Sequence, residues 1–444
     1  MTGSAPSRRA DDPPVRLALV LGGRASAGAY AAGAASEILA ALDRSPAGRV
    51  ELAVLCGTSA GSLSAAVGAR AMAVNPGLLP FLEKLWVEAL DVRHLLEPGG
   101  RGTAGIFRQA PLLELGSALI AADPASDDRR ARGVADTLSL GMTLSNLNGV
   151  PRRRRFHFRH AADRTCDVRV HRDAAAFRLG AATDAADPVW EVVRDAALAS
   201  MATPFVLPPV ELDRGKLSRP DARLAGAPDS GRMWFADGDW LAHEPIRLAR
   251  RLARSSPGAE EADWRYVVVD PHLEDMDDDG VRPDTRIGVA RAVARATLGR
   301  GSDHDWIASA ELNARVELFE SLVRHLPEVA EGLLDPDALD LGREIARLAE
   351  VAAEHDVARD GIDDEEAALE RLDAELDRIG RDPRFAPALE RTGTRAGRTR
   401  LAKLIYILES AGDLRDRRFL TLHRVAPRSG ERLAGVSLGH LGGF

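Results

Sequence analysis

Ser59 lies at the centre of the sequence Gly-Thr-Ser-Ala-Gly at positions 57–61. This is the G-x-S-x-G pattern of a sharp strand-to-helix turn that exposes a serine hydroxyl for attack on an acyl group. Gly57 and Gly61 fit such a turn because side chains there would collide with the neighbouring strand or helix. An apolar run at 51–56 precedes the motif. This context favours a nucleophilic serine over an ordinary tight turn, and the positive end of the following helix would favour an oxyanion.

A serine hydroxyl becomes a nucleophile only when a base removes its proton and hydrogen-bond donors receive the charge that develops on the substrate oxygen. The glycine-rich connection at 22–28 follows the apolar run VRLALVL at 15–21. This connection begins at the end of that strand, next to the strand that precedes Ser59. We therefore expect its backbone N–H groups to be the donors. A phosphate-binding loop is disfavoured, because G-K-[ST] and the dinucleotide-binding glycine spacing are both absent.

Asp237 is the preferred candidate for the base. It follows the apolar run WFA and precedes a glycine, at a strand end where a carboxylate can be buried and directed toward a neighbouring strand. An Asp-Gly pair alone is more often a simple turn. The alternative is a Ser-Asp-His triad, whose candidate members are Asp270, His272, His423 and His440. That triad suits folds in which several strands precede the nucleophile, whereas only two strand-like runs precede Ser59.

Four blocks of the sequence, in the same order, resemble the patatin-like phospholipase family. They are residues 20–30, 57–61, 197–210 and 237–245. The resemblance extends over about 15–272 and implies a three-layer α/β/α fold with a mainly parallel central sheet. Two strand-turn-helix units near the start of the chain independently indicate the α/β class. The resemblance also implies a Ser59–Asp237 dyad without histidine, and it implies no metal or other cofactor.

In the mechanism that this resemblance implies, Asp237 accepts the proton of Ser59, and the N–H groups of Gly23, Arg24 and Ala25 hold the oxyanion. An acyl-enzyme forms, and water activated by Asp237 then releases the fatty acid. The loop departs from the family's run of glycines followed by arginine, because side chains are present at positions 24 and 25. Backbone donors survive such changes, but Arg and Ala restrict φ and therefore the geometry of the oxyanion hole.

The block that begins at Asp237 contains three further candidates, Gly238, Asp239 and His243, which would surround the dyad. Asp239 replaces the second glycine of the family's Asp-Gly-Gly. Two nearby carboxylates raise each other's proton affinity, so Asp239 would either tune Asp237 as a base or inactivate it at neutral pH. His243 stands where the family usually has asparagine, and it is either a hydrogen-bonding partner or a residue at a helix start.

Composition divides the chain into four parts. We expect a disordered tail at 1–14, the catalytic domain at 15–272, a mainly helical region at 273–417, and a strand with a Gly-rich tail at 418–444 that packs back on the catalytic domain. The strands expected after the second helix are 137–143, 154–159, 233–236 and 266–269. The further helices expected in the catalytic domain are 78–95, 188–201 and 245–253.

The 444 residues carry a formal net charge of −8, and this acidity argues against nucleic acid as a partner. Two cysteines cannot build a disulfide framework or a cysteine zinc site, and both are expected to be buried. The sequence has neither an apolar leader nor a run of about 18 apolar residues. We therefore expect a cytoplasmic protein that contacts a membrane surface transiently.

Three weaker signals are more typical of structure than of binding. The helix at 78–95 has an apolar face that would cap a lipid site or touch a membrane, but a core helix is favoured. Four arginines at 152–155 would suit phosphate or anionic lipid, but a solvated strand start is favoured. An acidic segment at 275–280 resembles the start of a calcium-binding loop, yet Arg286 occupies its twelfth position, which favours a surface loop.

The sequence therefore predicts a serine lipid acyl hydrolase of the phospholipase A or lysophospholipase type, acting on a lipid acyl ester. Two alternatives use the same residues differently. One is a catalytically weakened patatin-like protein with a binding or regulatory role, and the other is a soluble esterase or acyltransferase with the same dyad. The head group, acyl position, oligomeric state, protein partner and role of 286–412 stay open.

Overall fold

The computed structural model describes most of the chain in segments. They are residues 15–23, 28–46, 49–86, 107–121, 129–158, 161–204, 206–217, 231–241, 245–260, 262–270, 285–332, 339–359, 365–415 and 417–427. The expected tail at 1–14 and the acidic segment at 275–280 lie outside these residues. The chain forms two compact units, the first made of 1–307 and 421–444 and the second of 308–420.

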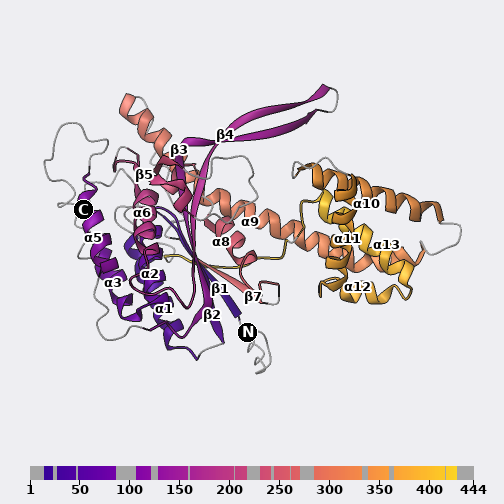
Figure 1. Ribbon diagram of the computed structural model, residues 1–444, viewed down its shortest axis with the longest axis horizontal. Coiled ribbons are helices and arrows are strands. Elements are labelled where there is room, and N and C mark those ends of the chain that lie inside the picture. The colour runs from indigo at the N-terminus through magenta and orange to yellow at the C-terminus, as the bar shows by residue number, and fades with distance from the viewer. Residues whose placement is uncertain are drawn as a thin grey trace. The chain divides into compact units, whose positions relative to one another are not determined.

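The described strands of the first unit form one eight-stranded sheet in the order β5-β6-β3-β2-β1-β7-β8, with β4 paired to β3. Their bounds are β1 Val15–Leu21, β2 Val50–Gly57, β3 Val134–Phe158, β4 Ala161–Leu179, β5 Val210–Asp213, β6 Arg232–Ala236, β7 Asp263–Val269 and β8 Thr421–Val425. The five strands β3, β2, β1, β7 and β8 are parallel to one another. The predicted mainly parallel α/β sheet is therefore confirmed, with β8 returning to it from near the end of the chain (Figure 1).

Helices cover both faces of this sheet. A Cβ placed on Gly68 of α2 would lie 3.5 Å from Leu55 of β2, whereas one on Gly141 of β3 would lie 2.8 Å from Cys56 of β2 and 2.7 Å from Leu252 of α8. Successive residues of a strand point to opposite faces, so α2 covers one face and α8 the other. The helices are α1 Gly28–Arg44, α2 Ala60–Ala73, α3 Leu79–Lys84, α5 Ala110–Ala121, α6 Val189–Met201, α7 Gly238–Leu241 and α8 Pro245–Arg254.

The second unit is helical. It contains the end of α9 (Arg286–Gly332), followed by α10 Leu339–Arg359, α11 Glu365–Arg381, α12 Ala386–Arg391 and α13 Arg395–Ala411. Phe319 of α9 and Phe385 meet edge to face, with ring centroids 6.0 Å apart. Arg378 of α11 forms ion pairs with Glu375, at 2.7 Å, and with the fully buried Glu409 of α13. Apolar packing and a buried ion-pair network therefore both join these helices.

The predicted strands at 137–143 and 154–159 are corrected by the structure. Positions 137–143 and 154–158 belong to one strand, β3, and position 159 lies outside the described residues. The antiparallel partner β4 was not predicted. The arginine run and Asn148-Gly149 interrupt the apolar alternation from which a strand is predicted. Cys56 is buried as expected, but Cys166 is exposed on β4.

Two further boundaries differ from the predictions. Helix α3 covers Leu79–Lys84, and positions 87–95 of the helix expected at 78–95 lie outside the described residues. The first unit extends to position 307 and not 272. The reason is contact, not composition: Asp305 Oδ2 accepts a hydrogen bond from Ile246 N–H at 2.6 Å, and Trp306 Nε1–H donates to Asp270 at 3.3 Å. No helix in the described part of the chain is long and apolar enough to cross a membrane.

Candidate active site

The turn that carries Ser59 joins β2 to α2. Ser59 has φ 47° and ψ −127°, a backbone conformation that is uncommon for residues other than glycine. The turn needs its two flanking glycines, because a Cβ on Gly57 would lie 2.4 Å from the carbonyl oxygen of Gly61, and one on Gly61 would lie 2.3 Å from that of Leu21. The Ser59 side chain does not cap α2, so its hydroxyl is available to another partner.

That partner is Asp237, at the end of β6. Ser59 Oγ donates a hydrogen bond to Asp237 Oδ2 at 3.1 Å, and the two side chains are 4% and 2% exposed. The backbone of Asp237 is fixed at both ends, because its N–H donates to Ala202 O at 3.0 Å and its carbonyl oxygen accepts from Ser145 Oγ at 2.7 Å. The structure therefore brings together the two residues predicted to form the dyad.

The environment of Asp237 favours its neutral form. Burial is the main cause, and the charge of Asp239 adds to it, so that the pKa of Asp237 is raised to about 7. Three hydrogen bonds oppose this shift: from Asp239 N–H at 2.9 Å, from Thr203 Oγ1 at 2.5 Å and from Ser59 Oγ. A carboxyl group with this pKa is a stronger base than an ordinary aspartate, and it is ionised only near and above neutral pH.

Asp239 contacts Thr58, the residue before Ser59. Thr58 Oγ1 donates a hydrogen bond to Asp239 Oδ1, and Thr143 Oγ1 donates to Thr58 Oγ1 at 2.7 Å. A Cβ on Gly23 would lie 2.4 Å from Asp239 Oδ2 and 2.7 Å from Ser59 Cβ. The second carboxylate thus packs against Gly23, the first residue of the predicted oxyanion loop.

Gly238 is required between the two aspartates. A Cβ at this position would lie 2.2 Å from Thr143 Oγ1 and 2.3 Å from Thr143 O. The glycine therefore lets the Asp237 turn lie directly on β3.

The end of α6 holds the Ser59 turn in place. Ser59 N–H donates to Ser200 Oγ at 3.1 Å, and Ser200 Oγ donates to Thr143 O at 2.9 Å. The hydroxyls of Ser62 and Ser200 are 2.7 Å apart. The individual roles of Ser200 and Thr203 were not predicted, although both lie in the block at 197–210 that supports the family resemblance. Their partners are distant in sequence, so no local pattern marks them.

Other predicted residues are placed elsewhere or lie outside the described residues. Arg24, Ala25 and His243 are among the latter, as are His272 and His440 of the alternative triad. Asp270, the acid of that triad, accepts hydrogen bonds from Trp306 Nε1–H at 3.3 Å and from Arg424 Nε–H at 3.2 Å. Ser59 is therefore bonded to Asp237, while Asp270 is engaged with other groups.

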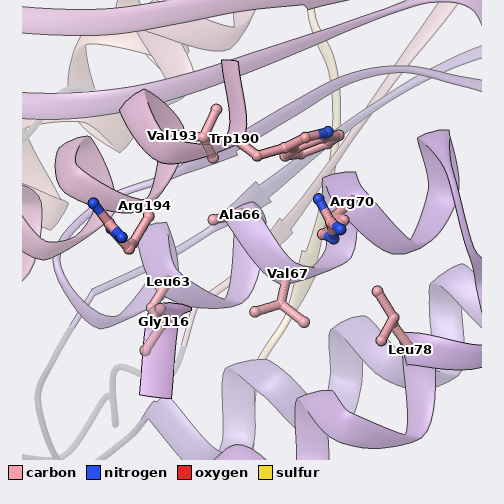
Figure 2. A pocket seen from close by; sticks show the side chains of 9 residues that line it. All are labelled: Leu63, Ala66, Val67, Arg70, Leu78, Gly116, Trp190, Val193 and Arg194. Atoms are coloured by element: carbon pink, nitrogen blue, oxygen red, sulfur yellow. The ribbon is translucent and has the colours of Figure 1, made fainter. Parts of the chain in front are cut away.

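A small apolar pocket lies along α2, and its first lining residue, Leu63, is one helical turn after Ser59. Figure 2 shows Ala66 and Val67 of α2 on one side of it, and Trp190 and Val193 of α6 on the other. Its other lining residues are Arg70, Leu78, Gly116 and Arg194. The Arg70 guanidinium lies 5.1 Å from the centroid of the Trp190 ring.

In the described part of the chain, no three His, Cys, Asp or Glu side chains are grouped to hold a metal ion. The chemistry available to the site is that of a hydroxyl bonded to a carboxylate with a raised pKa. Such a pair can transfer a proton from serine to aspartate while the serine oxygen attacks a carbonyl carbon.

An elbow serine bonded to a buried carboxylate, on a mainly parallel sheet, is the arrangement of α/β proteins that act on acyl groups. The family model of patatin-like phospholipases matches residues 19–250, just over half of the chain. The chain therefore belongs to the patatin-like phospholipase family, which is a family of lipid acyl hydrolases.

One relative is the uncharacterized protein y4iI of Sinorhizobium fredii (strain NBRC 101917 / NGR234). It is 26% identical over 375 residues, which is 64% of this chain and 53% of that protein. The chain thus spans about half the length of this relative.

Proposed function

We propose that this protein is a serine lipid acyl hydrolase of the phospholipase A or lysophospholipase type, with Ser59 as nucleophile and Asp237 as general base. The observation that carries the proposal is the 3.1 Å hydrogen bond from Ser59 Oγ to Asp237 Oδ2 at a strand-to-helix turn. Family membership supports the substrate class, because patatin-like phospholipases act on lipid esters. Residues 19–250, which match the family model, contain both members of the dyad.

In the first half of the reaction, the carboxylate of Asp237 takes the hydroxyl proton as Ser59 Oγ attacks the ester carbonyl carbon. The carbonyl oxygen becomes an oxyanion, and it is stabilised by the N–H of Gly23 and by the N-terminal end of α2. The tetrahedral intermediate then expels the alcohol, which leaves with the proton from Asp237. The product is an acyl ester of Ser59.

In the second half, water replaces the alcohol. Asp237, again a carboxylate, takes a proton from the water as its oxygen attacks the acyl-enzyme. The collapse of the second intermediate returns that proton to Ser59 Oγ and releases the fatty acid. Thr203 and the Asp239 N–H keep the Asp237 carboxylate oriented through both halves.

The hydrolysis rate is expected to depend on a group that titrates near pH 7. Only the carboxylate form of Asp237 can accept the serine proton, and its pKa is raised to about 7. The value of kcat/KM for a short-chain ester should therefore rise with pH through about 7 and level off above it. Asp239→Asn removes the like charge and should shift this rising limb of the kcat/KM profile to lower pH by about one unit.

The pH profiles of wild type, Asp239→Asn and Asp239→Glu check this prediction. The Asp239→Glu control keeps the charge, so its limb should stay near that of wild type. A limb at the same pH in all three proteins would show that the second carboxylate does not tune the base.

The pocket along α2 is proposed to receive the acyl chain. It is lined mainly by apolar side chains and begins one helical turn, about 5 Å, beyond Ser59. Ala66→Phe would fill the space between α2 and α6. We expect this variant to lose activity on long-chain esters by roughly tenfold relative to short-chain esters, measured as kcat/KM over a series of acyl lengths. An equal loss at every chain length would contradict the assignment.

The position of Asp239 favours a second candidate function. Its carboxylate packs against Gly23, and a negative charge there opposes the formation of an oxyanion. On this candidate, the chain is a catalytically weakened family member with a binding or regulatory role. Wild type would then hydrolyse esters far more slowly than Asp239→Asn or Asp239→Gly does.

The substrate class is tested by incubating the purified chain with phospholipid, lysophospholipid and a water-soluble ester, each with and without an acceptor alcohol. Free fatty acid from the lipids, absent with Ser59→Ala, is the result that the proposal predicts. Cleavage of the soluble ester alone would indicate an esterase instead, and acyl transfer to the added alcohol in place of fatty acid release would indicate an acyltransferase.

A further inference from the structure

Strands β3 and β4 continue beyond the rest of the sheet. β2 pairs with β3 as far as Met142, and β6 pairs with it only at Ser145 and Asn146. From Val150 onward, the described pairing of β3 is with β4 alone. Figure 1 shows the two strands running together past the ends of the other strands. We call residues 150–158 of β3 and 161–170 of β4 the arm; its strands are roughly 30 Å long.

The arm differs in charge from the rest of the chain. Positions 150–170 contain seven arginines and two aspartates, a formal charge of +5, whereas the whole chain carries −8. Four of the arginines are consecutive, at 152–155, and their backbones pair with 165–168 of β4. Charged residues do protect exposed strand edges from aggregation. A few charges of either sign are enough for that purpose, so a concentration of one sign points to an anionic partner.

The arm is also expected to have low stability without a partner. A two-stranded ribbon is only marginally stable in water, because it has no third strand and no covering layer. Pro151, Cys166, Asp167 and Arg169 are all exposed on it. The ribbon continues the strand that carries Thr143 and Ser145, so a surface bound by the arm is linked through β3 to the candidate active site.

We propose that the arm docks the first unit on membrane surfaces that contain anionic phospholipid. The choice of a lipid surface rests on the proposed function, because the substrate of a lipid acyl hydrolase lies in such a surface. Arginines attract anionic headgroups at short range, and this attraction is screened by salt. The last residues of β3 include Phe156 and Phe158, a residue type that partitions into the interface between headgroups and acyl chains.

The first test is sedimentation of the full chain with vesicles of phosphatidylcholine alone or mixed with phosphatidylglycerol. Wild type should bind the mixed vesicles, bind phosphatidylcholine much more weakly, and dissociate as salt is raised. The variant R152Q/R153Q/R154Q/R155Q should bind the mixed vesicles at least about tenfold more weakly. The matched control replaces four exposed arginines of the second unit by glutamine, namely Arg343, Arg347, Arg395 and Arg398, and should bind like wild type.

The second test reports contact at the arm itself. Cys166 is exposed, its backbone is paired with Arg154, and the other cysteine, Cys56, is fully buried. A polarity-sensitive fluorophore on Cys166 should therefore label the arm selectively. Its emission should shift to shorter wavelength with mixed vesicles and stay unchanged with phosphatidylcholine alone.

Failure of this inference is distinguishable from failure of the proposed function. If the arm variant hydrolyses a water-soluble ester like wild type but loses vesicle binding, the inference holds. If it binds mixed vesicles as tightly as wild type does, or if the labelled arm responds to duplex DNA and not to vesicles, the inference is overturned. Vesicle binding without any esterase activity would overturn the proposed function and leave the arm's role intact.

Discussion

Replacement of Ser59 by alanine is expected to lower kcat for ester hydrolysis by about 10⁴-fold or more, because it removes the atom that forms the acyl-enzyme. Asp237→Asn should have an effect of similar size. Asparagine has nearly the same shape, but it cannot accept the Ser59 proton. Steady-state kinetics on a short-chain ester measure both effects. The two losses should not add in the double variant, since the residues act as a unit.

Ser62→Ala is the matched control for these variants. Ser62 lies in the first turn of α2, three residues after Ser59, and is buried, but its hydroxyl contacts Ser200 and not the carboxylate. We expect this variant to keep kcat within about tenfold of wild type, because it loses only one buried hydrogen bond. A loss as large as that of Ser59→Ala would show that the assay reports disruption of the turn and not removal of the nucleophile.

Replacement of Gly23 by alanine is expected to lower kcat by about 10²-fold or more and to destabilise the fold by about 1–3 kcal/mol. A Cβ at this position would lie 2.4 Å from Asp239 Oδ2, 2.7 Å from Ser59 Cβ and 2.8 Å from Thr58 O. The last of these atoms is backbone and cannot rotate away. The loop must therefore move away from Ser59, which displaces the Gly23 N–H from the forming oxyanion.

Gly33→Ala is the control for that variant. Gly33 lies in α1, and a Cβ there would meet nothing within 4 Å. Alanine should stabilise the helix slightly and leave activity unchanged. Thermal unfolding and ester kinetics of the two variants measure the contrast. Wild-type activity in Gly23→Ala would contradict the placement of the oxyanion beside Gly23.

The central strands of the fold could be predicted from the sequence because buried strands have a simple pattern of consecutive apolar residues. The runs at 17–21 and 52–56 are continuous and apolar, as strands buried on both faces must be. Leu19, Val20 and Leu21 are indeed fully buried. The Ser59 turn was found for the same reason, since a glycine pair around a serine between such a run and a helix has a steric cause.

What escaped prediction depends on contacts and not on local pattern. Among the described strands β4 pairs with β3, and it reaches the core only at its end, where Ala175, Phe177 and Leu179 are buried. The rest of its sequence carries no apolar alternation from which a strand could be predicted. Ser200 and Thr203 bond to the turn and to Asp237 across 141 and 34 positions of sequence. The residues near the division at 307 include Asp305 and Trp306, which bond to Ile246 and Asp270 of the first unit. None of these features has a composition or spacing of its own.

The account depends most on Ser59 being activated by Asp237. The most direct measurement is reaction of the purified chain with a fluorophosphonate, followed by mass spectrometry of its peptides. The account predicts one phosphonate per chain, located on Ser59, with labelling abolished in Ser59→Ala and strongly slowed in Asp237→Asn. A folded wild-type protein that stays unlabelled, or that is labelled equally fast without Asp237, would contradict it.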